Sequence, residues 1–327
     1  MPRLLALMSI ALMLGATPPA ALAAPSADDV FRAVVQVSAE VPGDARTAEL
    51  LGTERAGSGV VIDDRGLVVT IGYLILEAMA ATITDSSGQS VPAEIVAYDY
   101  ESGFGLLRAL APIAAVPLML GDSDQLAAGT PALVLAHGGS AAALPARVSA
   151  RQEFAGYWEY LLDSAIFTTP LHPAWAGAGL IGADGKLLGI GSLQLPSAPG
   201  AQGESGNMFV PVNLLKPILG DLLAEGRRAG ASRPWLGMFT QEQSAGLVVT
   251  RVAPDSPADR AGIRPGDRVR SVGEQPVAGM ADLYRKVWSL GAAGVEVPVE
   301  VETDGLKRAV RLRSIDRYDY LKLNPTY

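Results

Sequence analysis

Two histidines and the absence of cysteine narrow the nucleophilic chemistry available to this chain. The 327-residue sequence contains His137, His172 and no cysteine. A serine hydroxyl is a poor nucleophile until a neighbouring base takes its proton and a third group orients that base. A lone histidine in a loop is more often a structural hydrogen-bonding group than a base. The two histidines are distant in sequence and no carboxylate sits at ligand spacing, so we expect neither a metal site nor a cofactor.

The segment 171–190 could carry a nucleophile, and it resembles the nucleophile loop of the trypsin-like serine proteases. That loop has the pattern N-P-G-N-S-G-G-P-L, followed after a few residues by D-G-x-(V/L)-(I/L)-G-I. Residues Asp184–Ile190, DGKLLGI, match the second half without a gap. Counting back places Pro173 on the motif proline, Gly177 on a motif glycine and Ala176 on the catalytic serine. A methyl group cannot attack a carbonyl, so the resemblance implies a silent nucleophile position.

The other two members of the triad are also replaced, in segments that resemble the HtrA (DegP-like) proteases. Residues 57–70, GSGVVIDDRGLVVT, are similar to the strand pair ahead of the family's catalytic histidine, whose position falls on Tyr73. Residues 99–108, DYESGFGLLR, are similar to the family's aspartate segment, which places that carboxylate on Gly103. A tyrosine with an ordinary pKa of about 10 is a poor proton acceptor at neutral pH. Gly103 has no side chain to orient a base, so the resemblance predicts a pseudoprotease.

The loop around the vacated serine position departs from the family pattern as well. Ala174 and Trp175 stand where the family has Gly-Asn, and Gly179 replaces its proline. Trp175 would fill space that a substrate or a serine hydroxyl needs. It is either a plug packed into the core or an aromatic platform that binds a peptide without cutting it. His172 lies four residues before Ala176, on the motif asparagine, and we expect a structural role for it.

The C-terminal part of the chain resembles a PDZ domain of the bacterial HtrA type. Its best match is the segment 261–269, AGIRPGDRV, to the pattern A-G-(I/L)-x-x-G-D-x-(I/V). A PDZ domain holds a peptide beside an open strand edge, while successive backbone N–H groups bind the terminal carboxylate. The peptide-binding residues that the resemblance implies are Trp235, Leu236, Gly237, Met238, Leu283 and Val287. We expect a preference for apolar C-termini; the alternative is a plain turn followed by a helix whose face is core.

Short apolar runs separated by polar turns surround these segments, which is typical of a sandwich or barrel rather than of β-α-β units. We expect one set of strands between residues 34 and 110 and a second between 131 and 212. Asn213 is expected to cap a helix that Gly226 ends. The resemblance implies a mostly β fold, with a trypsin-like double β-barrel over residues 24–226 and an α+β PDZ domain over 233–314. A linker, 227–232, would join them, and 315–327 would form a tail.

The N-terminus has the features of a secretory signal peptide over residues 1–23. Arg3 supplies the positive charge, residues 4–15 the apolar run and Ala21–Ala23 an A-x-A cleavage site, with cleavage after Ala23. The run is shorter than the ~20 residues that a membrane span needs, and no later segment is long and apolar enough to span. Without cysteine a secreted chain must rely on its core, and a hydrophobic content of 49% makes that feasible. We expect a periplasmic location.

Charge and family resemblance limit the partners. A formal net charge of −8 argues against nucleic acid or an anionic membrane surface as the main partner. We expect the partners to be polypeptides or protein C-termini. The chain would bind them as a non-catalytic protein in envelope quality control or as a scaffold. One alternative is an active HtrA-type serine endopeptidase. Another is an inactive subunit that co-assembles with an active relative, because HtrA proteins commonly form trimers, so a homotrimer or a mixed oligomer is implied.

Overall fold

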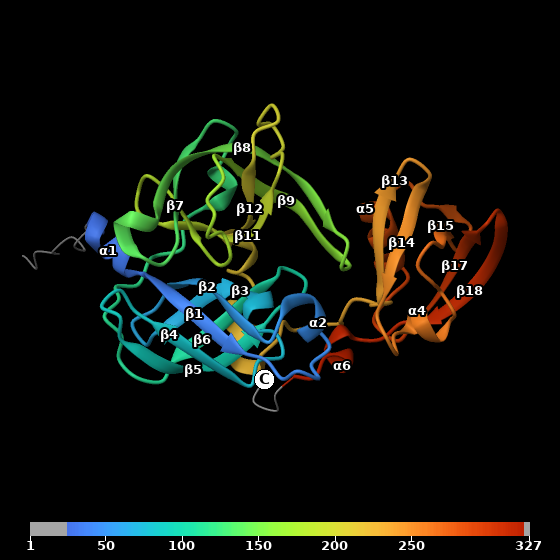
Figure 1. Ribbon diagram of the computed structural model, residues 1–327, viewed down its shortest axis with the longest axis horizontal. Helices are drawn as coiled ribbons and strands as arrows, with labels where there is room; N and C mark the ends of the chain where they lie inside the picture. The colour runs from blue at the N-terminus through green and yellow to red at the C-terminus, as the bar shows by residue number, and fades with distance from the viewer. Residues whose placement is uncertain (1–24, 324–327) are drawn as a thin grey trace, which may run out of the picture.

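The computed structural model describes residues 25–323 of the chain. Within these residues it contains two closed barrels and one open sheet of six strands. Figure 1 shows one barrel above the other, with the open sheet and its helices to one side. The expected signal peptide, residues 1–23, lies outside the described residues. None of the helices in the described part of the chain combines the length and the apolar character that crossing a membrane needs.

The first barrel closes through the strand order β1-β2-β3-β6-β5-β4. Its strands are β1 (Val34–Glu40), β2 (Glu54–Val61), β3 (Leu67–Ile71), β4 (Ala80–Thr84), β5 (Ser90–Tyr98) and β6 (Phe104–Ala109). Helix α1 (Ala27–Arg32) precedes β1. Helix α2 (Ala48–Leu51) and the 3-10 turn η1 (Gly72–Leu74) lie between strands of the barrel. Ser26 and Asp29 cap α1 reciprocally, as their spacing predicts. The expected strands of this part are confirmed, with ends that shift by a few residues.

The second barrel closes through the strand order β10-β11-β12-β9-β8-β7. Its strands are β7 (Pro131–Leu135), β8 (Ala143–Gly156), β9 (Tyr160–Thr169), β10 (Gly179–Ile181), β11 (Leu187–Leu195) and β12 (Gly206–Pro211). Two 3-10 turns, η2 (Ser123–Gln125) and η3 (Gly139–Ala142), precede β7 and β8. Strands β8 and β9 are 14 and 10 residues long. Their shared turn extends out of the barrel toward the open sheet (Figure 1).

The helix expected after Asn213 begins later than the sequence pattern predicts. Val212–Leu214 forms the 3-10 turn η4, and α3 covers Leu219–Glu225. The Asn213 side-chain amide donates instead to Asp122 Oδ1 at 2.7 Å, and the Asn213 N–H donates to Ser123 Oγ at 3.1 Å. The predicted cap is therefore wrong, because this side chain ties the end of β12 to the segment that joins the two barrels.

The open sheet has the strand order β13-β14-β15-β17-β18, and β16 pairs with β15. Its strands are β13 (Met238–Gln243), β14 (Gly246–Val252), β15 (Arg268–Val272), β16 (Gln275–Pro276), β17 (Glu296–Thr303) and β18 (Leu306–Arg313). Two helices, α4 (Pro257–Arg260) and α5 (Met280–Ser289), accompany it. Ser256 caps α4 by accepting the Asp259 N–H, which decides between Ser256 and Asp255, the two caps that the sequence allows. The apolar face of α5 packs on the sheet and forms its core.

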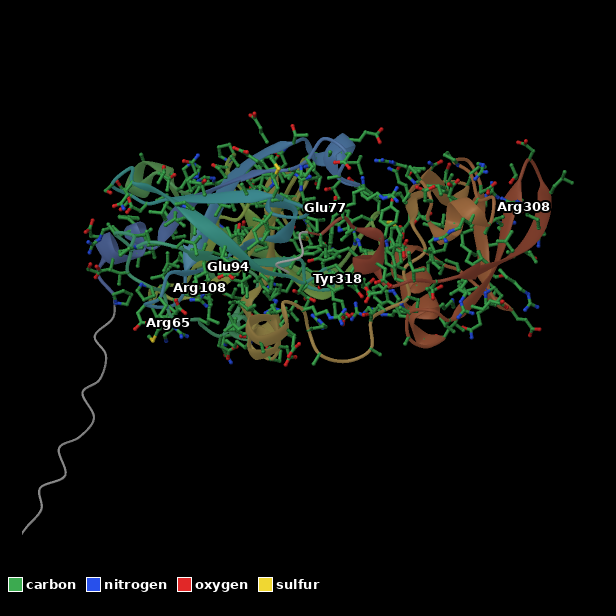
Figure 2. All side chains as sticks on the ribbon, turned by 90° about the horizontal axis from the view of Figure 1, so that it is seen from below. Arg65, Glu77, Glu94, Arg108, Arg308 and Tyr318 are labelled. Atoms are coloured by element: carbon green, nitrogen blue, oxygen red, sulfur yellow. The ribbon has the colours of Figure 1, made fainter. Side chains whose placement is uncertain are left out.

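The segment after β18 turns back toward the first barrel. It contains α6 (Arg317–Tyr320), where the Tyr318 hydroxyl donates to the carbonyl of Tyr98 at 2.5 Å. The N–H of Lys322 donates to Glu77 Oε1 at 2.7 Å. Figure 2 shows Glu77 and Tyr318 on the side of the barrel that faces the open sheet. Residues 315–323 thus join the first barrel to the open sheet.

Candidate functional site

Tyr73, at the predicted position of the general base, lies in η1 directly after β3. Its hydroxyl donates to the carbonyl of Ser192 in β11 at 2.9 Å, so it links the two barrels. Burial raises the pKa of Tyr73 well above its ordinary value, because the phenolate would lose its hydration. The hydroxyl is therefore protonated at neutral pH and acts as a donor.

Gly103, at the predicted position of the orienting carboxylate, lies next to Tyr73 in the turn before β6. Its carbonyl accepts the N–H of Gly72 at 2.7 Å. This turn contains two carboxylates, Asp99 and Glu101, of which Asp99 is 1% exposed. It is turned to Arg228, whose Nε and Nη2 donate to its two oxygens at 3.0 and 2.7 Å. The two carboxylate oxygens of Asp99 are therefore engaged in an ion pair with Arg228.

Ala176, at the predicted position of the nucleophile, lies between β9 and β10 and against β2. Its carbonyl accepts the N–H of Ser58 at 2.8 Å. The next N–H, that of Gly177, donates to the carbonyl of Gly191 at 2.9 Å. An oxyanion hole needs N–H groups free to point at the substrate oxygen. At Gly177 that donor is committed to the protein's own backbone.

A cavity of about 310 Å³ opens beside two of the three predicted triad positions, Tyr73 and Gly103, while Ala176, also described, is not among its lining residues. Tyr73, Gly103 and Trp175 contribute to its wall. Trp175 is half-buried and lines this space. The other aromatic and cationic side chains of the wall are Tyr98, Tyr100, Tyr157, Trp158, Tyr160, Trp235, Phe239, Tyr320, Arg46, Arg251 and Arg317.

His172 has both ring nitrogens engaged with the backbone. Its Nδ1 accepts the N–H of Ala174 at 3.1 Å, which leaves Nε2–H to donate to the carbonyl of Ala142 at 3.1 Å. The residue is 6% exposed. The Asn207 side chain accepts the backbone N–H of His172 and donates to its carbonyl. This geometry agrees with the structural role expected for His172.

The other histidine forms a pair that the sequence patterns did not indicate. His137 Nδ1 lies 3.2 Å from Ser58 Oγ, and the His137 N–H donates to the same oxygen at 3.0 Å. Burial lowers the pKa of His137. Ser58 is 1% exposed, and neither residue lines the 310 Å³ cavity. Among the described hydrogen bonds, no carboxylate orients this imidazole, as the base of a triad requires.

The loop predicted to bind carboxylates has the backbone shape that this role needs. The N–H groups of Leu236, Gly237 and Met238 converge on one carboxylate, that of Glu159 at the β8–β9 turn. Gly237 has φ +79°, and a Cβ there would lie 2.3 Å from the Cβ of Ser256. Glycine is therefore required for this turn.

The other residues predicted to bind a peptide, Trp235, Leu283 and Val287, lie in two different environments. Trp235 donates its N–H to the carbonyl of Ile315 at 3.0 Å, and its ring lies 4.5 Å from the ring of Tyr320. It thus packs on α6. Leu283 and Val287, each 2% exposed, face the core of the sheet together. Leu161 and Ala155 of the β8–β9 hairpin pack in the same cluster.

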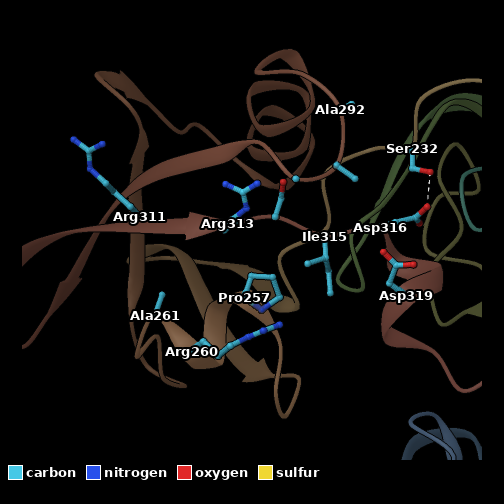
Figure 3. Close-up of a pocket in the computed structure, with 13 residues that line it drawn as sticks. Ser232, Pro257, Arg260, Ala261, Ala292, Arg311, Arg313, Ile315, Asp316 and Asp319 are labelled. Carbon is cyan, nitrogen blue, oxygen red and sulfur yellow. Dashed lines mark hydrogen bonds between the residues drawn. The ribbon is translucent and has the colours of Figure 1, made fainter.

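A second cavity, of about 650 Å³, lies between the open sheet and α6 (Figure 3). Arg260, Arg313 and Asp319 contribute to its wall, and the Ser232 hydroxyl donates to Asp316 at 2.5 Å beside it. The six residues predicted for peptide binding, all of them described, are absent from its lining. It is therefore distinct from the predicted groove.

The carboxylate of Glu159 makes stability depend on pH. Burial raises the pKa of Glu159 to about 7, although the N–H donors of 236–238 and Arg317 of α6 act to lower it. Glu101 and Arg233 are the other charged residues that line the small cavity beside Glu159. An exposed glutamate has a pKa of about 4.3, so the folded chain binds this proton more tightly than the unfolded chain. The stabilisation is complete below the unfolded value and is lost as the pH rises through about 7.

We therefore expect wild type to lose stability relative to Glu159→Gln as the pH rises from about 5 to about 8, because glutamine does not titrate. Denaturant unfolding of both proteins across this range measures the difference. A stability gap that stays constant with pH would contradict the assignment.

Comparison with known proteins supports the two-part organisation. Residues 57–190 match the trypsin-like peptidase domain family, and 248–302 match the PDZ domain family. The chain is 26% identical over 298 residues to a probable periplasmic serine endoprotease DegP-like of Ectopseudomonas mendocina, covering 86% of this chain and 60% of that protein. It is 28% identical over 290 residues to the serine protease PepD of Mycobacterium tuberculosis, covering 80% and 62%. A solved structure, the HtrA-type protease AlgW with decapeptide, has a TM-score of 0.54 at 19% identity, covering 92% of this chain and 100% of that one.

These matches confirm the mostly β fold class, a trypsin-like double β-barrel followed by a PDZ domain. In its combination of a trypsin-like peptidase domain with a PDZ domain, the chain is similar to the DegP-like relative. It spans about 60% of the length of the two curated relatives.

Glu159 and the pair Ser58–His137 are the residues of these sites that sequence patterns did not single out. Both contacts join distant parts of the chain: 79 residues separate Ser58 from His137, and 77 separate Glu159 from Leu236. The one local signal at Glu159 is an aromatic turn, Tyr157–Trp158, followed by an acid. That signal does not identify a partner.

Proposed function

We propose that this HtrA/DegP-like chain is a catalytically inactive pseudoprotease of the periplasm that binds polypeptides, with its PDZ groove recognising protein C-termini. The observation that carries the proposal is the loss of all three catalytic groups. Tyr73 donates where a base should accept, Gly103 offers no carboxylate and Ala176 offers no nucleophile. Acyl transfer needs these groups together. The periplasmic location is supported by the signal-peptide pattern and by the similarity to a probable periplasmic endoprotease.

Polypeptide binding is supported at two places in the molecule. The N–H groups of 236–238 already hold a carboxylate, which is the chemistry that recognition of a chain terminus requires. The 310 Å³ cavity offers aromatic side chains, Trp175 among them, together with three arginines. A wall of this kind suits an extended peptide with apolar side chains. Such a protein would serve in envelope quality control or as a scaffold.

We expect the purified chain to leave casein intact and to remain unlabelled by a fluorophosphonate probe, because no activated hydroxyl faces the cavity. Ala176→Ser is expected to stay unlabelled too, since the hydroxyl that it adds still lacks a base. Gel fluorescence after probe treatment reads both results. An active DegP-like relative treated in parallel shows that the probe and substrate work.

An active serine hydrolase is the second candidate, and the Ser58–His137 pair is the observation that favours it. The variant Ser58→Ala separates the two functions. Labelling of wild type that disappears in Ser58→Ala would identify a nucleophile and overturn the proposal. Labelling of neither protein leaves Ser58 as a structural hydroxyl that supports the loop of His137.

A further inference from the structure

The turn between β8 and β9 extends toward the PDZ domain (Figure 1), and its Glu159 carboxylate contacts that domain. The N–H groups of Gly237 and Met238 donate to Glu159 Oε1 at 2.6 and 3.0 Å, and that of Leu236 donates to Oε2 at 3.0 Å. A chain terminus presents the same two carboxyl oxygens. The donors expected for a bound C-terminus are thus already used by a residue of this chain.

The backbone beside Glu159 lies between the two walls of the groove. The N–H of Thr240 in β13 donates to the carbonyl of Tyr157 at 3.4 Å. From the opposite wall, the hydroxyl of Tyr284 in α5 donates to the carbonyl of Gly156 at 2.7 Å. A peptide added to the sheet would make main-chain hydrogen bonds to the same strand. The hairpin turn therefore occupies the path that such a peptide would follow.

Apolar side chains of the hairpin cover the pocket predicted for a peptide's last residue. Leu161 of β9, 8% exposed, belongs to the same buried cluster as Leu283 and Val287, and Ala155 of β8 packs against it. Burial of apolar area is the same driving force that a terminal side chain would use. The hairpin thus occupies both the carboxylate-binding loop and the apolar pocket.

Two ion pairs fix the hairpin to α5 at the surface. Arg285 contacts Glu153 of β8 at 2.6 Å and Asp163 of β9 at 2.5 Å. All three side chains are substantially exposed, so each pair contributes little to the free energy of the contact. This makes Glu153 a suitable comparison for Glu159, because it lies on the same hairpin and has the same charge but does not reach the carboxylate loop.

The backbone of Glu159 has the conformation that its place in the hairpin requires. Gly156 of β8 pairs with Tyr160 of β9, so residues 157–159 form a three-residue loop, and the last residue of such a loop is ordinarily left-handed. Glu159 accordingly has φ +59°. The three N–H groups of 236–238 hold its side chain.

We propose that Glu159 and its hairpin are an internal ligand of the PDZ groove, which a protein C-terminus must displace in order to bind. The inference rests on the proposed peptide-binding function and adds how that site is controlled. When only a fraction of molecules has an open groove, the apparent affinity for a peptide falls by that fraction. By linkage, a bound C-terminus releases the hairpin to the same extent. Occupancy of the groove is thereby coupled to the turn, whose Tyr157 and Trp158 line the 310 Å³ cavity between the barrels and the PDZ domain.

The test compares wild type, Glu159→Ala, Glu159→Gln and Glu153→Gln as full chains. The probe is a set of short fluorescent peptides that end in valine, leucine, isoleucine or phenylalanine with a free carboxylate, with C-terminal amides as the negative set. We expect Glu159→Ala to bind the acids at least ~10-fold more tightly than wild type, the factor that corresponds to 1.4 kcal/mol. Glu159→Gln should gain affinity as well, and Glu153→Gln should match wild type.

Amide hydrogen exchange of residues 236–238, measured without peptide, keeps this inference separate from the proposed function. Faster exchange in Glu159→Ala than in Glu153→Gln supports the internal ligand even if no peptide binds any variant, in which case the proposed peptide binding is what fails. Exchange and peptide affinity that are the same in wild type and in both Glu159 variants would overturn the internal ligand.

Discussion

Gly177→Ala is expected to destabilise the chain by more than about 4 kcal/mol, a loss large enough to prevent folding. A Cβ at this position would lie 1.8 Å from the carbonyl oxygen of Ser58 and 2.6 Å from Thr70 Oγ1. Both neighbours are fixed, because Thr70 Oγ1 donates to that carbonyl at 2.6 Å and the Ser58 N–H is bound to Ala176. The loop of the vacated serine therefore cannot move away from the added methyl group without breaking its contact with β2.

The backbone conformation adds to this cost, and a second glycine separates the two effects. Gly177 has φ +74°, where a Cβ costs about 1–2 kcal/mol by itself. Gly88, in the turn after β4, has φ +86° with nothing within 4 Å of an added Cβ. We expect Gly88→Ala to lose only the conformational part. Denaturant midpoints followed by circular dichroism give both values, and equal losses in the two variants would contradict the steric argument.

Asp99→Ala is expected to cost about 3–5 kcal/mol, the usual loss when one partner of a buried ion pair is removed. Asp99 is 1% exposed, and both of its oxygens bind the guanidinium of Arg228. It also accepts the N–H and the hydroxyl of Ser102, at 2.9 and 2.5 Å. The variant would leave these donors without their acceptor in the turn that holds Gly103. It would also release the segment that leads from the barrels to the PDZ domain, because Arg228 lies in it.

The matched control for this prediction is Asp124→Ala. Asp124 pairs with Arg151 at 3.6 Å, and its side chain is 69% exposed. An exposed pair of this kind is worth about 0–1 kcal/mol. Thermal and denaturant unfolding of the two variants should therefore differ by several kcal/mol. A loss in Asp99→Ala as small as that of Asp124→Ala would show that the Arg228 pair is not an anchor of the linker.

The strand pattern could be predicted closely because its determinants are local. The strand predicted at Leu67–Ile71 is found at those residues, preceded by a turn in which Asp63 accepts the N–H groups of Arg65 and Leu67. The hairpin around Asp304-Gly305 follows from turn chemistry in the same way. The helix expected to start at Asn213 begins later, because Asn213 Oδ1, the atom that a cap would use, accepts from Lys216 Nζ at 2.7 Å while the side-chain amide donates to Asp122.

The residue types at the three positions predicted for a triad were determined by the sequence itself, because the presence of a methyl group, a glycine or a phenol is a covalent fact that no packing alters. Tertiary structure decided what faces the PDZ loop. The order of residues shows that Leu236–Met238 can present three N–H groups, but their partner, Glu159, lies 77 residues before Leu236. A hydrogen bond across that separation depends on how far β8 and β9 extend from their barrel and where α6 and the linker hold the second domain. These distances exist only in the folded molecule, so only the tertiary structure shows that the groove holds a residue of its own chain.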